Sequence, residues 1–365
     1  MIFEGIGPYS AIGRVAMQGV TLALDAGWEV TVVTKRLDES LVPRVEWLKM
    51  HVPPKFFYYQ WITARKFIRQ ALGNRTFDVI HAHQPQVADL SDIFQCHFLT
   101  RAAYERKSLT RVRNLRSAFI RIQEQGVLHA EDNFYRTWNP NTRMMYDSEL
   151  TRDDFHRLYG KLKSESVMVY AFPKLHIPND QERVAAKVKL IGAEHKGPVL
   201  GFLGGLHERK GYRALISGLE GDNSVFLLMG GQYSAGFQAP TLAGRFKAVG
   251  LVEDIKTFYH ACDAFIVPSY YEPLGLVGFE AAANGVPVIA TPEVGALPHL
   301  LEYGAGCAWN RTESLPAVVQ NITAERKSCN AGAVRMEQDL GAKAYGERLI
   351  KEYYLIRDSK LKSRE

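Results

Sequence analysis

The chain has 365 residues, of which 46% are hydrophobic and 23% charged, a composition that excludes fibrous, collagenous and low-complexity classes. Its length exceeds the roughly 250 to 300 residues at which a single core stops growing, so two domains are expected. The formal net charge is +6, and residues 1–172 hold 23 Lys and Arg against 18 Asp and Glu, which favours an acidic partner near the first half, either anionic lipid or a phosphate-bearing substrate.

Several classes of partner and compartment are not expected. The basic residues match no nucleic-acid-binding motif, so nucleic acid is not predicted as a partner. The opening residues MIFEGIGPYS lack a charged stretch followed by an apolar core, so no secretory signal is expected, and no apolar run reaches the roughly 18 residues of a membrane span. The cysteines are scattered, which argues against disulfides and a structural zinc site; they are Cys96, Cys262, Cys307 and Cys329. A reducing, cytoplasmic protein is predicted.

In the first half, helical patterns alternate with short apolar runs. The segment MIFEGIG leaves room for only a short first strand, and a helical pattern follows in GRVAMQGVTLALDAG. Strand-like runs lie at 29–35, 45–52, 77–83, 92–98 and 142–148. A helix is expected over KFFYYQWITARKFIRQALG, between the second and third of these runs.

The second half repeats this alternation. Strand-like runs lie at 198–204, 224–231, 264–269 and 286–291, each separated by a helical stretch. Such alternation predicts βαβ units and doubly wound parallel sheets. Two prolines in AFPKLHIPND place the break between Rossmann-like α/β domains at 1–172 and 173–340. The two sheets are expected to face each other across a central cleft, and the helical stretch 340–365 is a candidate to pack back on the first domain.

Residues 271–291, YEPLGLVGFEAAANGVPVIAT, contain two glutamates eight positions apart, Glu272 and Glu280. The proline favours a helix start, and Asn-Gly is a common helix stop, which predicts a helix from about 274 or 275 to 283. The first-turn N–H groups and the positive dipole end predict an anion site suited to a diphosphate. Eight helical positions cover roughly 12 Å, so the two carboxylates could bind hydroxyls on either side of it. The alternative is a surface acid beside a helix-capping acid.

This segment resembles the signature of retaining family 4 glycosyltransferases, which have two facing Rossmann-like (GT-B-like) domains. The resemblance implies that Glu272 contacts the transferred sugar and Glu280 the nucleotide ribose. It also implies that the backbone N–H groups of Gly275 and Leu276 meet the phosphates.

Two neighbouring segments resemble the same family. GFLGGLHERKG, at 201–211, resembles its strand-end loop, which implies that Lys210 neutralises the leaving diphosphate; Arg209 stands in for the arginine that many relatives carry where this chain has Gly205. The alternative is a solvated charged turn. In GRFKAVGLVEDIKTFYHACDAFIVPSYYEP, at 244–273, the resemblance places the backbone of Val249 and Gly250 by the nucleobase.

The first domain carries weaker matches. GIGPYSAIGRVA, at 5–16, resembles the family's glycine-rich loop, which implies that Gly13 lies close to donor phosphate. FDVIHAH resembles a family strand, and its histidines, His81 and His83, are interpreted as structural in preference to a metal pair without a third ligand. His97 in FQCHFLT falls where the family often has a histidine near the transferred sugar; a core histidine is the alternative.

Residues 101–121, RAAYERKSLTRVRNLRSAFIR, carry seven Lys and Arg and one Glu. Apolar residues recur at three- and four-residue steps, which predicts an amphipathic helix. It is either an interfacial helix that binds anionic lipid or a charged acceptor, or an ordinary helix with a solvated face.

The resemblance implies a retaining transfer of a sugar from a nucleotide-diphosphate sugar to an acceptor hydroxyl of a glycan, glycolipid or small molecule. No Asp-x-Asp triplet occurs, so no metal ion is expected. No other cofactor is predicted. The alternatives are a sugar phosphorylase, a nucleotide-sugar epimerase, or a non-catalytic subunit that binds a sugar nucleotide. The protein is expected in the cytoplasm, free or peripheral to the membrane.

Overall fold

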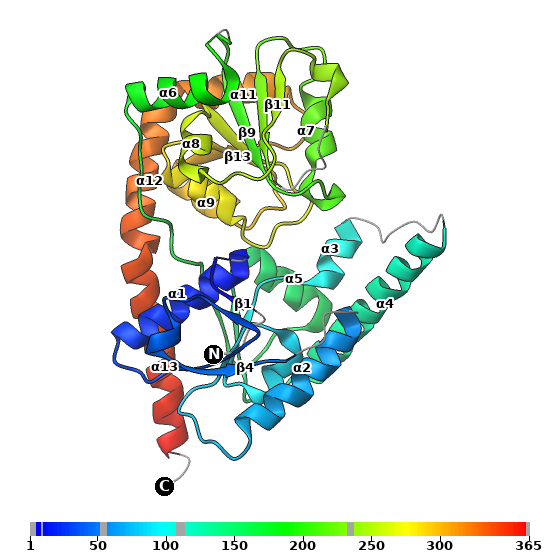
Figure 1. The fold of residues 1–365 in the computed structure, drawn as a ribbon, viewed down its shortest axis with the longest axis vertical. Helices are drawn as coiled ribbons and strands as arrows, with labels where there is room; N and C mark the ends of the chain where they lie inside the picture. The colour runs from blue at the N-terminus through cyan, green and yellow to red at the C-terminus, as the bar shows by residue number, and fades with distance from the viewer. Residues whose placement is uncertain are drawn as a thin grey trace. The chain divides into compact units, whose positions relative to one another are not determined.

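A computed structural model describes residues 5–8, 10–51, 57–106, 114–193, 195–231 and 237–362. It divides into two compact units (Figure 1). The first unit comprises Met1–Tyr170 and Tyr345–Glu365, and the second comprises Ala171–Ala344. The chain therefore leaves the first unit once and returns to it with its last helix.

All strand pairs described in the first unit are parallel. Its largest sheet has the order β5-β6-β7-β8, from His81–Ala82, Ile93–Cys96, Arg143–Tyr146 and Glu165–Val167. Two further pairs are β2 (Thr31–Thr34) with β4 (Glu46–Lys49), and β1 (Gly5–Ile6) with β3 (Arg36–Leu37). Strands lie in all five runs that the sequence indicates, although the run at 77–83 forms only the two residues of β5.

Helices cover these strands. They are α1 (Ala11–Asp25), α2 (Phe57–Leu72), α3 (Thr100–Arg106), α4 (Leu115–Arg136), α5 (Glu149–Tyr159) and α13 (Ala342–Lys362), with short 3-10 turns at Val42–Arg44 and Pro85–Leu90. Helices α1 and α13 pack closely at Gly346 (Figure 1). A side chain there would clash, since a Cβ at Gly346 would lie 2.7 Å from the Leu22 side chain. None of the described helices is long and apolar enough to cross a membrane.

The prediction of one helix over 101–121 is wrong. Helix α3 ends at Arg106, and Asn114 caps the start of α4 with an extended backbone (φ −159°). The Asn114 side chain accepts from the Ser117 N–H, and the Ser117 hydroxyl accepts from the Asn114 N–H, each at 2.9 Å. This capping box starts a new helix at Leu115. Residues 107–113 lie outside the described part of the chain.

The second unit contains one six-stranded parallel sheet. Its strand order is β11-β10-β9-β12-β13-β14, with bounds Phe246–Ala248, Phe226–Gly230, Val199–Leu203, Ala264–Val267, Val288–Ala290 and Gly306–Ala308. The chain starts in the middle at β9, moves outward to β11, and then returns to the other side of β9 with β12. Doubly wound sheets bind ligands at the carboxyl ends of the strands where the order reverses, here between β9 and β12.

Among the described residues of this unit, seven helices accompany the sheet: α6 (Asp180–Ile191), α7 (Tyr212–Gly218), α8 (Ile255–His260), α9 (Leu276–Ala283), α10 (Leu297–Glu302), α11 (Leu315–Ala324) and α12 (Arg326–Leu340). Two 3-10 turns are also described: η3 (Glu208–Lys210) lies between β9 and α7, and η4 (Pro240–Leu242) lies between β10 and β11. The core between sheet and helices is apolar and includes Leu200, Phe202, Ile266, Ile289 and Trp309.

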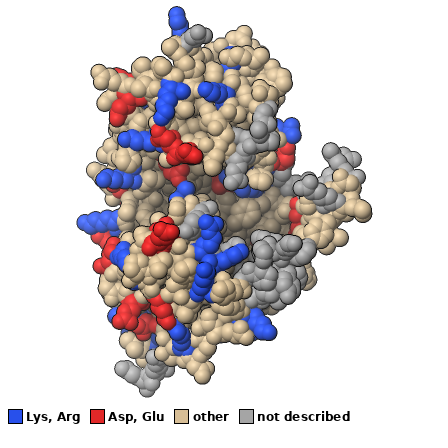
Figure 2. Space-filling view, viewed as in Figure 1, with Lys and Arg blue, Asp and Glu red and all other residues tan. Residues whose placement is uncertain are grey.

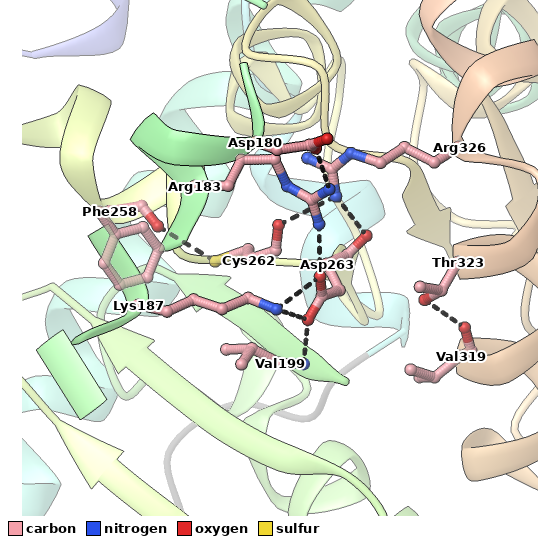
Figure 3. Close-up of polar contacts among 10 residues, drawn as sticks. All are labelled: Asp180, Arg183, Lys187, Val199, Phe258, Cys262, Asp263, Val319, Thr323 and Arg326. Atoms are coloured by element: carbon pink, nitrogen blue, oxygen red, sulfur yellow. Dashed lines mark hydrogen bonds and ion pairs between the residues drawn. The ribbon is translucent and has the colours of Figure 1, made fainter. Parts of the chain in front are cut away.

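A charged cluster around Asp263 joins elements at the amino edge of this sheet (Figure 3). Asp263 is 5% exposed, and its carboxylate accepts from Arg183 (2.6 Å), Lys187 (2.6 Å) and the Val199 N–H (2.8 Å). Arg326 donates to the Asp263 carbonyl at 3.2 Å, and its burial lowers its pKa to about 10. Asp263 and its partners lie at the amino ends of β9 and β12. Their contacts therefore fix α6 and α12 at the edge of the sheet opposite the carboxyl ends of the strands, where the strand order reverses.

Candidate functional site

The loop after β12 leads into a helix start of unusual backbone geometry. Gly275 has a left-handed φ of 91°, and no side chain caps α9. A Cβ on Gly275 would lie 3.0 Å from the Val294 side chain, so both the backbone and the space favour glycine. The N–H groups of Leu276 and Val277 are therefore donors suited to an anion, whereas the Gly278 N–H already donates to the Gly275 carbonyl at 2.8 Å. The helix spans the residues that the sequence predicts.

Glu272 lies in this loop, and backbone bonds hold it on both sides. Its N–H donates to the Glu293 carbonyl and its carbonyl accepts from the Gly295 N–H, each at 2.9 Å. Its carboxylate accepts from Lys210 at 2.5 Å, from Arg209 at 3.3 Å and from the Ser269 hydroxyl at 3.4 Å. The structure thus brings together three of the four predicted catalytic residues.

The charges of this group are interdependent. Burial raises the pKa of the Glu272 carboxyl, but the Lys210 ammonium and the Arg209 guanidinium outweigh it and hold the pKa below its ordinary value. The side chains of Glu272 and Lys210 are only 16% and 20% exposed, so solvent screens the pair weakly. The site therefore holds an ionised acid and two cations, with one positive charge in excess.

Arg209 and Lys210 are placed by η3, which follows β9. Gly211 ends this turn at φ 72°, and a Cβ there would lie 1.9 Å from the Pro268 carbonyl oxygen. Arg209 donates to the Tyr271 carbonyl at 2.5 Å, and the Tyr270 N–H donates to the Arg209 carbonyl at 2.8 Å. Turn η3, which follows β9, and the loop that follows β12 and carries Glu272 are consequently held together by hydrogen bonds at the point where the strand order reverses.

Glu280 lies on α9, and sequence analysis missed the residue that orients it. The Tyr259 hydroxyl, from α8, donates to Glu280 Oε2 at 3.0 Å, and it lies 3.3 Å from the Val277 carbonyl oxygen. Nothing in the sequence around Tyr259 marks it as a partner of an acid on another helix. The contact restrains the Glu280 carboxylate at the side of the helix.

Val249 and Gly250 follow β11 at the same edge of the sheet. The Val249 N–H donates to the Met229 carbonyl at 2.9 Å, and the Gly250 carbonyl accepts from the Gly231 N–H at 2.7 Å. Gly250 has a left-handed φ of 69°. All the predicted donor-site residues of the second unit therefore lie at the carboxyl edge of one sheet, after β9, β11 and β12.

In the first unit, Gly13 lies in the first turn of α1, where the helix packs on β1. A Cβ at Gly13 would lie 2.5 Å from the Gly5 carbonyl oxygen, so glycine is required by packing alone. Its N–H donates to the Ser10 hydroxyl at 3.0 Å. Its role near donor phosphate stays a prediction.

His97 belongs to a buried cluster with His81 and His83. His97 Nε2 lies 2.9 Å from His83 Nδ1, and His97 Nδ1 contacts the Tyr170 hydroxyl, while His81 Nδ1 lies 2.8 Å from the Tyr353 hydroxyl. Burial lowers the pKa of His81 and of His97 to about 3, so both are neutral near pH 7. No group of three or more His, Cys, Asp or Glu able to hold a metal was found within the described ranges.

Comparisons with known proteins bear on this arrangement. Residues 197–324 match the family described as glycosyl transferases group 1, and this range contains Lys210, Glu272 and Glu280. A probable transglycosylase from Burkholderia thailandensis is 32% identical over 206 residues, which are 54% of this chain and 53% of that protein. The match thus spans about half the length of that relative. A D-inositol 3-phosphate glycosyltransferase from Actinosynnema mirum is 24% identical over 82% of this chain and 80% of its own.

Solved structures share the fold over nearly the whole chain. A sucrose-phosphate synthase from Thermosynechococcus elongatus has a TM-score of 0.76 at 17% identity, covering 98% of both chains. WaaG, a glycosyltransferase involved in lipopolysaccharide biosynthesis, has a TM-score of 0.72 at 17% identity, covering 97% of this chain and 98% of its own. Anabaena HepE, solved with UDP-glucose, has a TM-score of 0.71 at 16% identity, covering 96% and 97%.

Proposed function

The chain has the fold of GT-B glycosyltransferases and carries a glycosyl transferases group 1 domain at residues 197–324, and from this premise we propose that it is a retaining glycosyltransferase. It moves a sugar from a nucleotide-diphosphate sugar to an acceptor hydroxyl, and no metal ion takes part. The acceptor is a carbohydrate, a lipid-linked sugar or a small molecule.

The grouping of Glu272, Lys210 and Arg209 beside the uncapped start of α9 carries this proposal. A leaving diphosphate gains charge as the bond to the sugar breaks. Donors and cations that are already in place stabilise this charge without reorganisation, which lowers the barrier to transfer. Since two cations and a helix start supply the stabilisation here, the reaction has no need of a metal.

Glu272 acts on the sugar and not as a nucleophile in this scheme. Its carboxylate is ionised and paired with both cations, which lowers its nucleophilicity but leaves lone pairs for sugar hydroxyls. The acceptor attacks on the face from which the diphosphate leaves. Glu280, oriented by Tyr259, binds the ribose hydroxyls. His97 has no part in this scheme, because both of its ring nitrogens already have partners in the buried cluster.

Contact with anionic lipid is a separate part of the proposal. On the face shown in Figure 2, basic and acidic side chains are interspersed, so long-range charge singles out no surface there. At the start of α4, however, Leu115 is 91% exposed, Phe119 48% and Ile122 63%, in a stretch rich in Lys and Arg. Exposed apolar side chains in a sequence rich in basic residues suit the boundary of an anionic membrane. We therefore propose that the protein contacts the cytoplasmic face of a membrane through the start of α4.

A thermal-shift screen with UDP-, GDP- and ADP-sugars tests the function. A ligand that binds only the folded protein raises the melting temperature as its concentration rises; a shift with one nucleotide series is expected, and UDP-sugars come first because the HepE structure contains one. Transfer to an acceptor should then be lost in Lys210→Ala and Glu280→Ala. Phosphate-dependent cleavage would indicate a phosphorylase, and donor conversion without acceptor an epimerase. No shift with any series would contradict the proposal.

A further inference from the structure

Arg311 has a backbone conformation that its side chain disfavours. Its φ is 68°, and it is the only non-glycine residue with positive φ in the described part of the chain. It lies between β14 and α11, outside the motifs that the sequence singles out. A residue with a Cβ in the left-handed region is held there by its surroundings, and such residues concentrate at functional sites.

The Arg311 guanidinium makes contacts in three directions. It donates to the Ser269 carbonyl at 2.8 Å and lies 3.3 Å from that of Pro268. It forms an ion pair with Glu293 at 3.0 Å, and its central carbon lies 4.3 Å from the centre of the Tyr270 ring. The side chain is 19% exposed, so these contacts are largely shielded from water.

These contacts fall on two segments that hold Glu272: residues 268–270 and the segment that contains Glu293. Residues 268–270 lie two to four positions before it, and the Glu293 carbonyl accepts a hydrogen bond from the Glu272 N–H at 2.9 Å. The Ser269 carbonyl also accepts from the Thr291 hydroxyl at 2.6 Å. Arg311 is thus joined to the chain before Glu272 and to the segment that pairs with it. The planar guanidinium of an arginine has several N–H donors and can bind both segments at once, whereas a lysine ammonium is a single point charge.

We propose that Arg311 is a positioning residue for Glu272. It holds the Glu272 carboxylate in register with Lys210 and thereby determines how well the sugar of the donor is bound. This inference rests on the proposed function, in which Glu272 contacts the sugar while Lys210 and Arg209 contact the diphosphate. Loss of Arg311 should therefore weaken binding of a nucleotide sugar more than binding of the nucleoside diphosphate alone.

The primary test uses Arg311→Gly, because glycine adopts the left-handed backbone freely, so the whole Arg311 side chain is removed without added backbone strain. Titration calorimetry measures binding of UDP-glucose, GDP-mannose and ADP-glucose, and of UDP, GDP and ADP. We expect affinity for the nucleotide sugar that wild type binds to fall about tenfold, and kcat/KM by ten- to a hundredfold, a size typical of misplaced groups. Affinity for the matching diphosphate should stay within about twofold of wild type, since the hydrogen bonds and the ion pair of Arg311 go to the Pro268 and Ser269 carbonyls and to Glu293.

Arg335→Ala is the matched control, because Arg335 also donates to a backbone carbonyl, that of Tyr303 at 2.7 Å, but away from the glutamate loop. It should change neither affinity. Arg311→Lys, which keeps the charge, should resemble Arg311→Gly and serves in its place if the glycine variant does not fold. Equal losses for sugar and diphosphate, or no loss, would overturn this inference alone. If wild type binds none of the six compounds, the proposed function fails with it.

Discussion

The ionisation of Glu272 couples the stability of the second unit to pH. Its pKa in the folded protein lies below the ordinary value of 4.5. A depressed pKa contributes stability above the unfolded value, and this contribution is lost as pH falls through the folded value. At pH 7, Glu272→Gln should lower the free energy of unfolding by about 1 to 3 kcal/mol, because Lys210 and Arg209 lose a charged partner. Below about pH 4.5 the difference from wild type should shrink.

Urea unfolding of wild type and Glu272→Gln between pH 7 and pH 3 measures this dependence. Glu293→Gln is a suitable control, since Glu293 pairs with Arg311 and is more exposed at 32%; its effect should be smaller throughout. A difference for Glu272→Gln that stayed constant down to pH 3 would contradict a depressed pKa at this residue.

Tyr259 provides a test of the Glu280 assignment. Tyr259→Phe removes the hydroxyl that donates to Glu280 but keeps the ring, which is buried in the core. We expect KM for the donor to rise about fivefold with little change in kcat, because a hydrogen bond of about 1 kcal/mol orients a group that binds the ribose equally before and during transfer. Steady-state kinetics measures both constants.

The control for this variant is Tyr303→Phe, which removes a hydroxyl that donates to exposed Asp339 at 3.1 Å. It should leave KM unchanged. A Tyr259→Phe enzyme with wild-type KM would mean that Glu280 needs no orienting partner or does not bind the donor.

The residues of the site differ in how far sequence could predict them. Glu272, Arg209 and Lys210 lie at strand ends flanked by glycines, and parallel topology brings such ends to one edge. Tyr259 and Arg311 reach the site through side-chain directions set by packing between elements far apart in sequence, and no local pattern encodes that. For His97 the sequence left two interpretations open, and the structure describes a buried, neutral histidine.

At the scale of elements, burial decides which strands are visible in sequence. The central strands β9, β10, β12 and β13 are apolar runs because helices cover both faces. The outermost strands of the same sheet, β11 and β14, went undetected. They are three residues each, Phe246–Ala248 and Gly306–Ala308, and an edge strand has no need of a continuous apolar run.

Gly211 provides a prediction at this scale, because it joins η3 to α7 against the loop after β12. Gly211→Ala adds a Cβ 1.9 Å from the Pro268 carbonyl oxygen, so the two loops must separate. Gly221→Ala is the matched control: its φ of 77° is similar, but nothing lies within 4 Å of the added Cβ. We expect Gly221→Ala to cost about 1 kcal/mol of stability through backbone strain alone.

Gly211→Ala should cost more, about 3 kcal/mol or above, because a steric clash is added to the same strain. Donor binding should fall as well, since Lys210 moves away from Glu272. Denaturant unfolding and titration calorimetry of both variants measure these effects. Equal destabilisation of the two would mean that the contact with Pro268 relaxes at no cost.

For the whole molecule, the order of the chain separates the two parts of the proposed reaction. All the residues assigned to the diphosphate, ribose and base lie in the second unit, apart from Gly13 in the first. The second unit has its own six-stranded sheet and apolar core, whereas the first unit is completed by the returning helix α13. Three large side chains of α13 are at most 4% exposed: Tyr345, Leu349 and Tyr353.

Residues 171–344 produced on their own should therefore form a folded fragment, because a domain with its own core can fold alone. This fragment should bind the same nucleoside diphosphate as the whole chain, with an affinity within about tenfold, but transfer no sugar, since the acceptor side is missing. The complementary fragment 1–170, which lacks α13, should lose cooperative unfolding because three large buried side chains are absent. Circular dichroism and calorimetry on both fragments test this division. A fragment 171–344 that folded but bound no diphosphate would show that the donor site requires the first unit, and Gly13 would then be the first residue to examine.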